Sequence, residues 1–507
     1  MKEFKPIAIF LSLLSIFACM ALIGFYFPKE GIYLNESFSL RFPQLNSFFT
    51  DEKKTDISKI LTLNDTLPVV DTLAITAIVQ ADSCASDTIN ANDSLAISDT
   101  IANQKYGEIK DPSLKLVTPL EYKDGNKSCM NAFFYSLANE INVSRTLHIL
   151  HYGDSQIESD RITDFLRMKL QAQFGGEGRG FVAITPVSSS HGLRQTWSNN
   201  WERYTLFTGR DKRIKHMDYG VGASFSRFVK YDSANDSSKT NEAWIKIKTT
   251  KTSNTRLSTY TKVKLFYGNA LYKTNVEFYE DGVLTTNDSL LVGGFFNSKQ
   301  FTVSTVLPQF EIKFKGKDSP DIYGVSLEGN GGIIVDNFGL RGSSGTFFNK
   351  LNSVQLKSFY DQMNVKLFII QFGENTLPYT KNKTQTDYFG KHLESQIKTL
   401  KKMVPNASVI VIGPADMSVK EGTEYVTHPQ LENLRDAIRL AAFNTNSAFF
   451  DMYECMGGKN SMVSWVDAGI AAKDYIHFSS TGARKIATIL YSAIINDFNE
   501  YVRKQAK

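Results

Sequence analysis

The sequence has 507 residues, of which 42% are hydrophobic, and a formal net charge of +5 at pH 7. This length is sufficient for two or three domains with sizeable cores. Because the net charge is small for the length and the Lys and Arg residues are scattered, the composition excludes the basic footprint of a nucleic-acid-binding protein, and we expect no nucleic-acid partner.

The first thirty residues differ from the rest of the chain. Lys2 and Lys5 precede an apolar run over residues 7–27 that is long enough to span a bilayer. This run is long for the core of a signal peptide and lacks a clear small-residue cleavage site, which favours an uncleaved signal anchor over a cleaved signal peptide. The positive-inside rule then predicts a periplasmic or cell-envelope location for the rest of the chain, anchored in the inner membrane by residues 7–27.

Residues 31–112 lack sustained periodicity, and their later part is rich in Asp, Ser, Thr, Asn and Ala. This composition predicts a flexible, low-complexity tether between the anchor and a folded body that begins at about residue 113. The four cysteines show neither metal-binding spacing nor a CxxC motif, so no metal or cofactor is expected. Cys129 and Cys455 can form a disulfide or remain free thiols.

Ser155 lies where a predicted strand meets a predicted helix. An apolar run over residues 147–150 predicts the strand, and Gly153 and Asp154 end it. Apolar residues at four-residue steps predict an amphipathic helix behind it: Ile162, Leu166, Leu170 and Phe174. At such a junction the serine N–H points out of a helix N-terminus, which favours an anion. Taken alone, the pattern fits either a nucleophilic serine or a plain helix cap.

The chain after residue 196 shows two further patterns of predicted secondary structure. Residues 197–330 contain short segments that alternate apolar with polar residues between Asn, Asp, Gly and Ser, which predicts an antiparallel β-sandwich. From residue 331 strands and helices alternate again. The strands are predicted over residues 333–336, 365–371, 408–412 and 448–452, and the helices over 346–363, 388–403, 430–443 and 481–502. This alternation predicts an α/β fold with a parallel sheet and helices on both faces. The sandwich is then an insertion that splits one domain into residues 113–196 and 331–507.

Four stretches place reactive residue types where the carboxyl ends of parallel strands meet. They are residues 153–155, 337–342, 373–375 and 474–477. Ser155 is the candidate nucleophile, and His477 is the candidate base that takes its proton and returns it to the leaving group. Asp474, three residues earlier, can hold the imidazole in the required tautomer. The backbone N–H groups of Ser155 and Gly342 and the side chain of Asn375 are the candidate oxyanion hole.

These four stretches, in this order, resemble the blocks of the SGNH (GDSL-type) hydrolase family, which carry Ser, Gly, Asn and a terminal Asp-x-x-His. The resemblance covers about residues 145–195 and 331–500, and it implies a three-layer SGNH-type α/β fold with esterase activity. Two positions depart from the family pattern. Gln156 replaces the usual Leu after the serine, and the third block reads GENT rather than GxND. The second departure keeps Asn375 but puts in doubt the contacts that hold the Asn375 side chain in place.

A finer resemblance is to the peptidoglycan O-acetylesterase branch of that family. Gly-Asp-Ser is followed by a polar residue and then IESD, and the predicted sandwich occupies the position of that branch's carbohydrate-module-like domain. The branch implies removal of acetyl groups from the C6 hydroxyl of N-acetylmuramic acid in the bacterial periplasm. The alternatives are an esterase or lipase acting on another acylated polysaccharide or on lipid, and a non-catalytic polysaccharide-binding protein.

Other polar residues near these blocks have simpler explanations. His148 and His151 flank the Ser155 strand without an evident carboxylate partner, which favours core or rim histidines. His428 is the second candidate base. Glu158 and Asp160 suit the start of a helix and are assigned no catalysis. We expect Arg341 either to contact substrate or to pair with Asp336.

Several aromatic residues lie in the insertion and can stack on sugars, although aromatic residues in a sandwich more often belong to its core: Trp197, Trp201, Trp244 and Tyr267.

Overall fold

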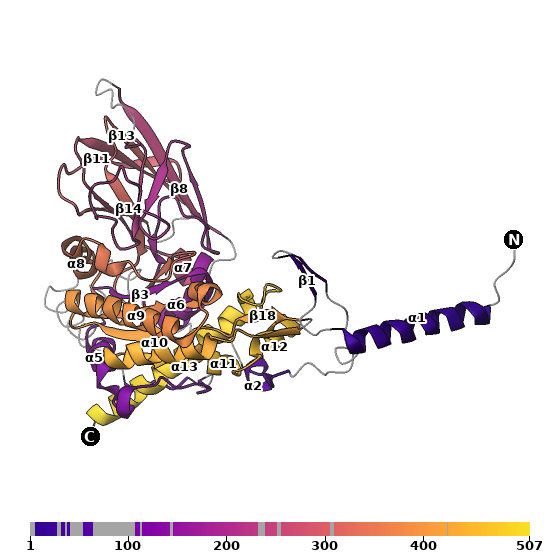
Figure 1. The fold of residues 1–507 in the computed structure, drawn as a ribbon. Helices are drawn as coiled ribbons and strands as arrows, with labels where there is room; N and C mark the ends of the chain where they lie inside the picture. Colours follow the sequence, from indigo (N-terminus) through magenta and orange to yellow (C-terminus); the bar gives the residue numbers. More distant parts are fainter. Residues whose placement is uncertain are drawn as a thin grey trace.

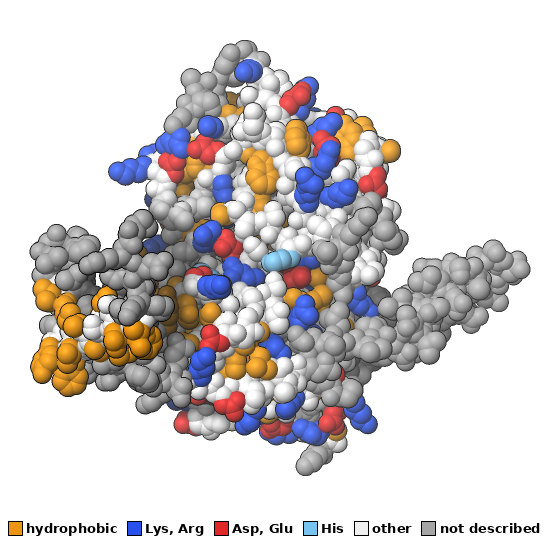
Figure 2. Space-filling model, turned by 90° about the vertical axis from the view of Figure 1, so that its right-hand side faces the viewer, with side chains coloured by type: hydrophobic (Ala, Val, Ile, Leu, Met, Phe, Trp, Pro, Cys, Tyr) orange, Lys and Arg blue, Asp and Glu red, His pale blue; other side chains and the backbone are white. Residues whose placement is uncertain are grey.

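The computed structural model of the chain consists of an α/β body and a β-sandwich that stands on one side of it (Figure 1). On the face drawn in Figure 2, Lys and Arg side chains are interspersed with Asp and Glu rather than gathered in one patch. The structure describes residues 6–27, 32–35, 38–40, 54–63, 107–111, 114–141, 145–231, 239–250, 255–304, 309–422 and 424–506.

The body is built on a five-stranded parallel sheet. Its strands are β15 (Ile333–Gly339), β3 (Leu147–Gly153), β16 (Val365–Gln371), β17 (Ser408–Ile412) and β20 (Ala448–Phe450), in that order across the sheet. Every neighbouring pair is parallel. The strands are almost continuously apolar because the sheet is buried on both faces.

Two hydrophobic clusters show that helices cover both faces of this sheet. In β16, Leu367 and Ile369 belong to the cluster that packs under one set of helices, α5 (Asn131–Asn139), α6 (Arg161–Phe174) and α13 (Ser480–Gln505). Phe368 and Ile370 point to the opposite face, which α8 (Ser353–Gln362), α9 (Lys383–Met403) and α10 (Leu431–Asn444) cover. The predicted three-layer α/β fold is therefore confirmed.

The smaller elements of the body complete its loops. They are α11 (Met452–Met456), α12 (Ser461–Asp467), the hairpin of β18 (Ser418–Glu421) and β19 (Glu424–Thr427), and the 3-10 helices η2 (Lys123–Gly125), η3 (Lys127–Met130), η4 (Ser155–Asp160), η5 (Phe348–Lys350) and η6 (Glu374–Tyr379).

The insertion is a sandwich of two antiparallel sheets. One has the order β11 (Val283–Leu290), β10 (Thr274–Glu280), β13 (Gln309–Gly316), β8 (Asn241–Thr249), β5 (Leu193–Trp197). The other has the order β12 (Asn297–Thr302), β9 (Lys262–Gly268), β14 (Asp321–Glu328), β7 (Ser224–Arg227), β6 (Glu202–Thr205), and β4 (Gly180–Val182) also pairs with β14. The short helix α7 (Thr255–Ser258) precedes β9. The sheets thus begin at Gly180, ahead of the predicted boundary at residue 197, because β4 and β5 pair with strands far along the chain.

The amino-terminal part is described only in pieces. Helix α1 (Pro6–Tyr26) carries exposed apolar side chains. In the part of the chain that the structure describes, no helix is long and apolar enough to cross a bilayer. The signal anchor therefore has no support from the structure and stays a prediction.

Most of the predicted tether, including residues 64–106, lies outside the described residues; β1 (Ile32–Asn35) and β2 (Phe38–Leu40) form a hairpin within it.

Residues 54–63 differ from the predicted tether. Ile60 lies on α2 (Ser58–Leu61), and Ile57 directly precedes this helix. Both are buried in the core of the body together with Leu63. The Oγ of Ser464 donates to the Thr55 carbonyl at 2.9 Å. This segment folds onto the body because its apolar residues recur every three positions, a pattern too short to stand out in the sequence.

Candidate active site

The carboxyl ends of β15, β3 and β16 bring three of the four predicted blocks together. β3 lies between β15 and β16, so the loops that follow all three strands meet beside Ser155. The Leu340 N–H donates to the Gly153 carbonyl at 2.8 Å, which ties the second block to the first. The Asn375 side chain donates to the Ser343 carbonyl at 3.1 Å, which ties the third block to the second.

The sequence predicted that the chain enters a helix directly after Ser155, but the structure shows a short helix and a kink before α6. Ser155 begins the short helix η4, and the Asp154 side chain accepts a hydrogen bond from the Gln156 N–H at its start. Ser159 and Asp160 then have positive φ angles of 58° and 71° before α6 begins at Arg161. The buried Asp160 carboxylate accepts two hydrogen bonds from Arg167, at 2.7 and 3.0 Å, which holds this kink in place.

Ser155, His477 and Asp474 form a hydrogen-bonded series. Ser155 Oγ lies 2.9 Å from His477 Nε2, and His477 Nδ1 lies 2.8 Å from Asp474 Oδ2. The other oxygen of Asp474 accepts from the backbone N–H groups of Ile476 and His477, both at 3.0 Å. Partial burial disfavours the charged carboxylate, but these hydrogen bonds outweigh burial and hold the pKa of Asp474 below its ordinary value. Asp474 is thus an anion that fixes the imidazole with one nitrogen facing the serine.

Gly342 and Asn375 lie in the loops that border this series. Gly342 is exposed, has a φ of +77° and has open space where a side chain would project, so its backbone remains accessible. Asn375 is half-buried at the start of η6. The structure therefore brings Ser155, Gly342, Asn375, Asp474 and His477 to one edge of the sheet.

Gln156 and Glu374 contact each other, which the sequence did not reveal. Gln156 Nε2 donates to Glu374 Oε2 at 2.8 Å and to the Ile476 carbonyl at 2.7 Å. The other oxygen of Glu374 accepts from the Ala415 N–H at 2.8 Å. Gln156, one of the two departures from the family pattern, therefore takes part in a buried network that joins the serine, asparagine and histidine blocks.

Two buried carboxyl groups lie in that network. Burial raises the pKa of Asp154, and burial together with the nearby Asp154 charge raises the pKa of Glu374. Asp154 Oδ2 is buried and has no hydrogen-bond partner among the described residues. At least one proton is therefore favoured on this pair near neutral pH.

His148, His151 and His428 make contacts away from Ser155. His148 is buried with Nδ1 2.7 Å from Asp336, whose charge outweighs burial and raises the pKa of His148. His151 lies between Thr163 and Gln371, and burial lowers its pKa to about 4. His428 accepts from the Gln430 N–H. His477 is thus the histidine whose ring contacts Ser155.

One alternative for Arg341 was an ion pair with Asp336, and the structure shows that this pair does not form. Its guanidinium lies 3.7 Å from Glu158, and its side chain is 67% exposed. Asp336 is unavailable because it faces His148 and accepts from the Phe181 N–H.

The aromatic side chains proposed for sugar stacking pack against the sandwich instead. The Trp201 ring contacts Phe228 and Phe314, and Tyr267 is buried in the same core. Trp197 packs against that core, while Trp244 is partly buried with Lys246 near its ring.

The thiols and possible metal ligands give no further site. Cys129 and Cys455 are free thiols. Among the described residues, no group of three or more His, Cys, Asp or Glu side chains could hold a metal ion.

Similarity to known proteins supports the predicted family resemblance and fold. Residues 288–490 match the family described as GDSL-like Lipase/Acylhydrolase, a span that contains Gly342, Asn375, Asp474 and His477 but not Ser155. The predicted resemblance to the SGNH (GDSL-type) hydrolases is confirmed.

Among solved structures, the chain is similar to a peptidoglycan O-acetylesterase at 23% identity, with a TM-score of 0.56, over 76% of this chain and 99% of that one. This similarity concerns the fold. Two weaker similarities are to a CBM35 from Paenibacillus barcinonensis (20% identity, TM-score 0.18, 27% of this chain and 91% of that one) and to a family two carbohydrate esterase from Clostridium thermocellum in complex with cellohexaose (9% identity, TM-score 0.23, 52% and 93%). No curated protein matches the chain.

Proposed function

We propose that this chain is a serine esterase of the SGNH type that removes O-acetyl groups from a cell-envelope carbohydrate. The first candidate substrate is peptidoglycan, acetylated at the C6 hydroxyl of N-acetylmuramic acid. The observation that carries the proposal is the hydrogen-bonded series from Ser155 through His477 to Asp474. The family match and the similar fold of a peptidoglycan O-acetylesterase support it.

In this proposal His477 accepts the Ser155 hydroxyl proton while Oγ attacks the acetyl carbonyl carbon. Asp474 keeps a proton on Nδ1 of His477 and stabilises the imidazolium that forms. The imidazolium then gives its proton to the departing sugar oxygen, which leaves an acetyl group on Ser155. A water molecule repeats the sequence on the acetyl-serine and releases acetate.

The backbone N–H groups of Ser155 and Gly342 and the Asn375 amide are the proposed donors to the negative oxygen of the tetrahedral intermediate. The bond from Asn375 to the Ser343 carbonyl uses one of its two N–H groups, which leaves the second for the intermediate. Donors of this kind act mainly in the transition state.

Acetate release from purified protein tests the proposal. Ser155→Ala should lower hydrolysis of a small acetyl ester and of O-acetylated peptidoglycan by about 10⁴-fold or more. Ser395→Ala, an exposed serine on α9, is the matched control and should behave as wild type. Full activity of the Ser155 variant would refute the assignment of the nucleophile.

A panel of substrates separates the alternatives. If the protein cleaves another acetylated polysaccharide but releases no acetate from O-acetylated peptidoglycan, the proposed substrate is wrong and the proposed esterase activity is supported. Activity confined to long-chain acyl esters would favour a lipase. Location in the cell envelope is also a proposal, and it rests on the charged and apolar pattern of residues 1–30. Cell fractionation that recovers the full chain in the cytoplasm would contradict it.

A further inference from the structure

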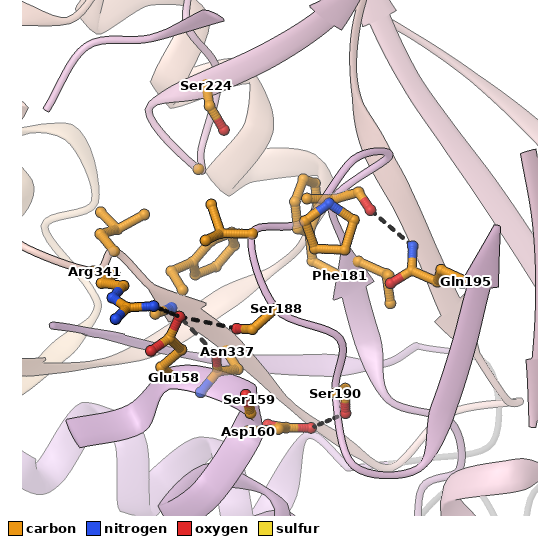
Figure 3. Close-up of a pocket in the computed structure, with 18 of the residues that line it drawn as sticks. Glu158, Ser159, Asp160, Phe181, Ser188, Ser190, Gln195, Ser224, Asn337 and Arg341 are labelled. Atoms are coloured by element: carbon orange, nitrogen blue, oxygen red, sulfur yellow. Dashed lines mark hydrogen bonds and ion pairs between the residues drawn. The ribbon is translucent and has the colours of Figure 1, made fainter. Parts of the chain in front are cut away.

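A cavity of about 330 Å³ lies between the body and the sandwich, a size within the range of small-molecule pockets (Figure 3). Its wall on the body side comes from η4 and the end of β15, with Glu158, Asn337 and Arg341. Its wall on the other side comes from the insertion, with Gln195 and Ser224 among its residues. Neither part of the chain forms this cavity without the other.

The cavity adjoins the candidate active site through the backbone. Glu158 is three residues after Ser155 within η4, and Arg341 directly precedes Gly342. One glycan chain can therefore present its ester to Ser155 and place a second group in the cavity.

Three of the four arginines that line the cavity have carboxylate partners. Arg167 and Arg179 contact Asp160 at 2.7 and 3.1 Å, and Arg341 lies 3.7 Å from Glu158. These charges are largely balanced within the protein.

Arg203, on β6, is the exception. Among the residues that the structure describes, no Asp or Glu forms an ion pair with it; its guanidinium donates to the Ser224 hydroxyl at 3.1 Å and to the Thr185 carbonyl at 3.4 Å. Burial lowers its pKa, with no neighbouring charge to oppose that effect. By contrast, the buried Arg227 on the adjacent strand pairs with two aspartates at 2.7 and 2.9 Å. Arg203 is half-buried and lines the cavity, so its guanidinium is partly desolvated without an anion from the described residues beside it. A carboxylate bound in the cavity would supply that anion.

We infer that the cavity is a subsite for a carboxylate borne by the acetylated glycan, with Arg203 as the residue that binds it. The inference rests on the proposed function and specifies its substrate as an acidic glycan. The cavity is also lined by Phe181, Phe207 and Phe338, whose rings suit the apolar faces of a sugar. The carboxylate can belong to a uronic acid, or to the lactyl ether of a muramic acid residue that carries no stem peptide, since the peptide is joined to that carboxyl as an amide. Arg binds either carboxylate through paired N–H groups.

Direct binding of matched sugars distinguishes these sources. One pair is N-acetylmuramic acid and N-acetylglucosamine, which differ by the lactyl carboxylate; the other is glucuronic acid and glucose. Dissociation constants are measured by ligand-detected NMR on the full chain carrying Ser155→Ala, with and without Arg203→Gln. Arg194→Gln removes the same charge from an exposed position on β5 and is the matched control. Circular dichroism and the melting temperature check the fold, and Arg203→Met, which also removes the charge, replaces Arg203→Gln if the latter does not fold.

The acidic member of at least one pair should bind about tenfold more tightly than its neutral twin, and Arg203→Gln should abolish that preference without weakening the neutral sugar. Preference for N-acetylmuramic acid assigns the lactyl carboxylate, and preference for glucuronic acid assigns a uronate. Equal binding within both pairs, or a preference that survives Arg203→Gln or fails in Arg194→Gln, overturns the inference. Absence of ester hydrolysis by the wild type would refute the proposed function alone, because binding is measured separately.

Discussion

The contact between Gln156 and Glu374 makes a prediction about stability. Gln156→Met removes the donor to Glu374 Oε2 and to the Ile476 carbonyl. Glu374→Met removes the acceptor of Gln156 and of the Ala415 N–H. Each single change therefore leaves two polar groups without partners. The double change also leaves two polar groups without partners, the Ile476 carbonyl and the Ala415 N–H. The Gln156 donor and the Glu374 acceptor, which bonded each other, are both removed and add no further unsatisfied group.

An unsatisfied buried polar group costs about 1–3 kcal/mol, so each single variant should lose about 2–6 kcal/mol of unfolding free energy. The double variant should lose about the same amount rather than the sum of about 4–12 kcal/mol. Urea unfolding followed by circular dichroism measures all four proteins. Gln156→Met combined with Gln396→Met, a buried glutamine that accepts from the Asn349 N–H, is the control cycle and should be additive.

Additivity of Gln156→Met and Glu374→Met within about 0.5 kcal/mol would refute the reasoning, because it would mean that the two side chains do not stabilise each other. Gln156→Met should also lower kcat for a small ester by about tenfold to a hundredfold, since its bond to the Ile476 carbonyl fixes the loop that carries His477. An unchanged kcat would mean that the hydrogen bonds of Gln156 do not contribute to catalysis.

Three further outcomes follow from the site. His477→Ala should be nearly inactive on a small acetyl ester and His428→Ala close to wild type, and the reverse ranking would reassign the base. Asn375→Ala should lower kcat by about 10²–10³-fold with little change in KM, whereas a change in KM alone would make Asn375 a ground-state binding residue. Because the pKa of Glu374 is raised in the folded protein, the stability that its protonated form contributes is complete below the ordinary carboxyl pKa and is lost as the pH rises through the raised value. Glu374→Gln should accordingly flatten the fall in melting temperature between about pH 5 and pH 9, and a parallel fall in both proteins would contradict this.

Periodicity predicted the layers of the body well because the buried strands are mostly apolar and alternate with amphipathic helices. The predicted limits 365–371 and 408–412 coincide with β16 and β17. The four blocks could be placed at one sheet edge because parallel strands bring their carboxyl ends together. The order of residues along the chain therefore carried most of the information about the site.

What the sequence did not reveal depends on contacts between distant residues. The positive φ angles at Ser159 and Asp160 are stabilised by Arg167 and by Arg179, which lies beyond α6. The strand β4 has three residues and exists because β14, more than 130 residues later, pairs with it. Gln156 was recognised as a departure from the family pattern, but only the structure shows that its side chain donates to Glu374, 218 residues later in the chain.

The last prediction concerns the insertion, which shares its core with the body. Phe181 of β4 packs on Phe338 of β15, with ring centroids 5.1 Å apart, and Phe266 of β9 packs on Phe359 of α8 at 5.5 Å. Phe338 and Phe359 are 3% and 0% exposed, so replacing residues 180–329 with a short linker would uncover both.

Exposing two such rings costs about 3–6 kcal/mol, which is comparable with the entire stability of a typical domain, about 5–15 kcal/mol. The shortened protein should therefore fail to give a cooperative melting transition. A folded, insertion-free body that hydrolyses small esters would contradict this, and would show that the sandwich is a separable module. If the body needs the sandwich to fold, then a cavity walled by both parts is a fixed feature of the enzyme, and its specificity is best altered by point variants such as Arg203→Gln.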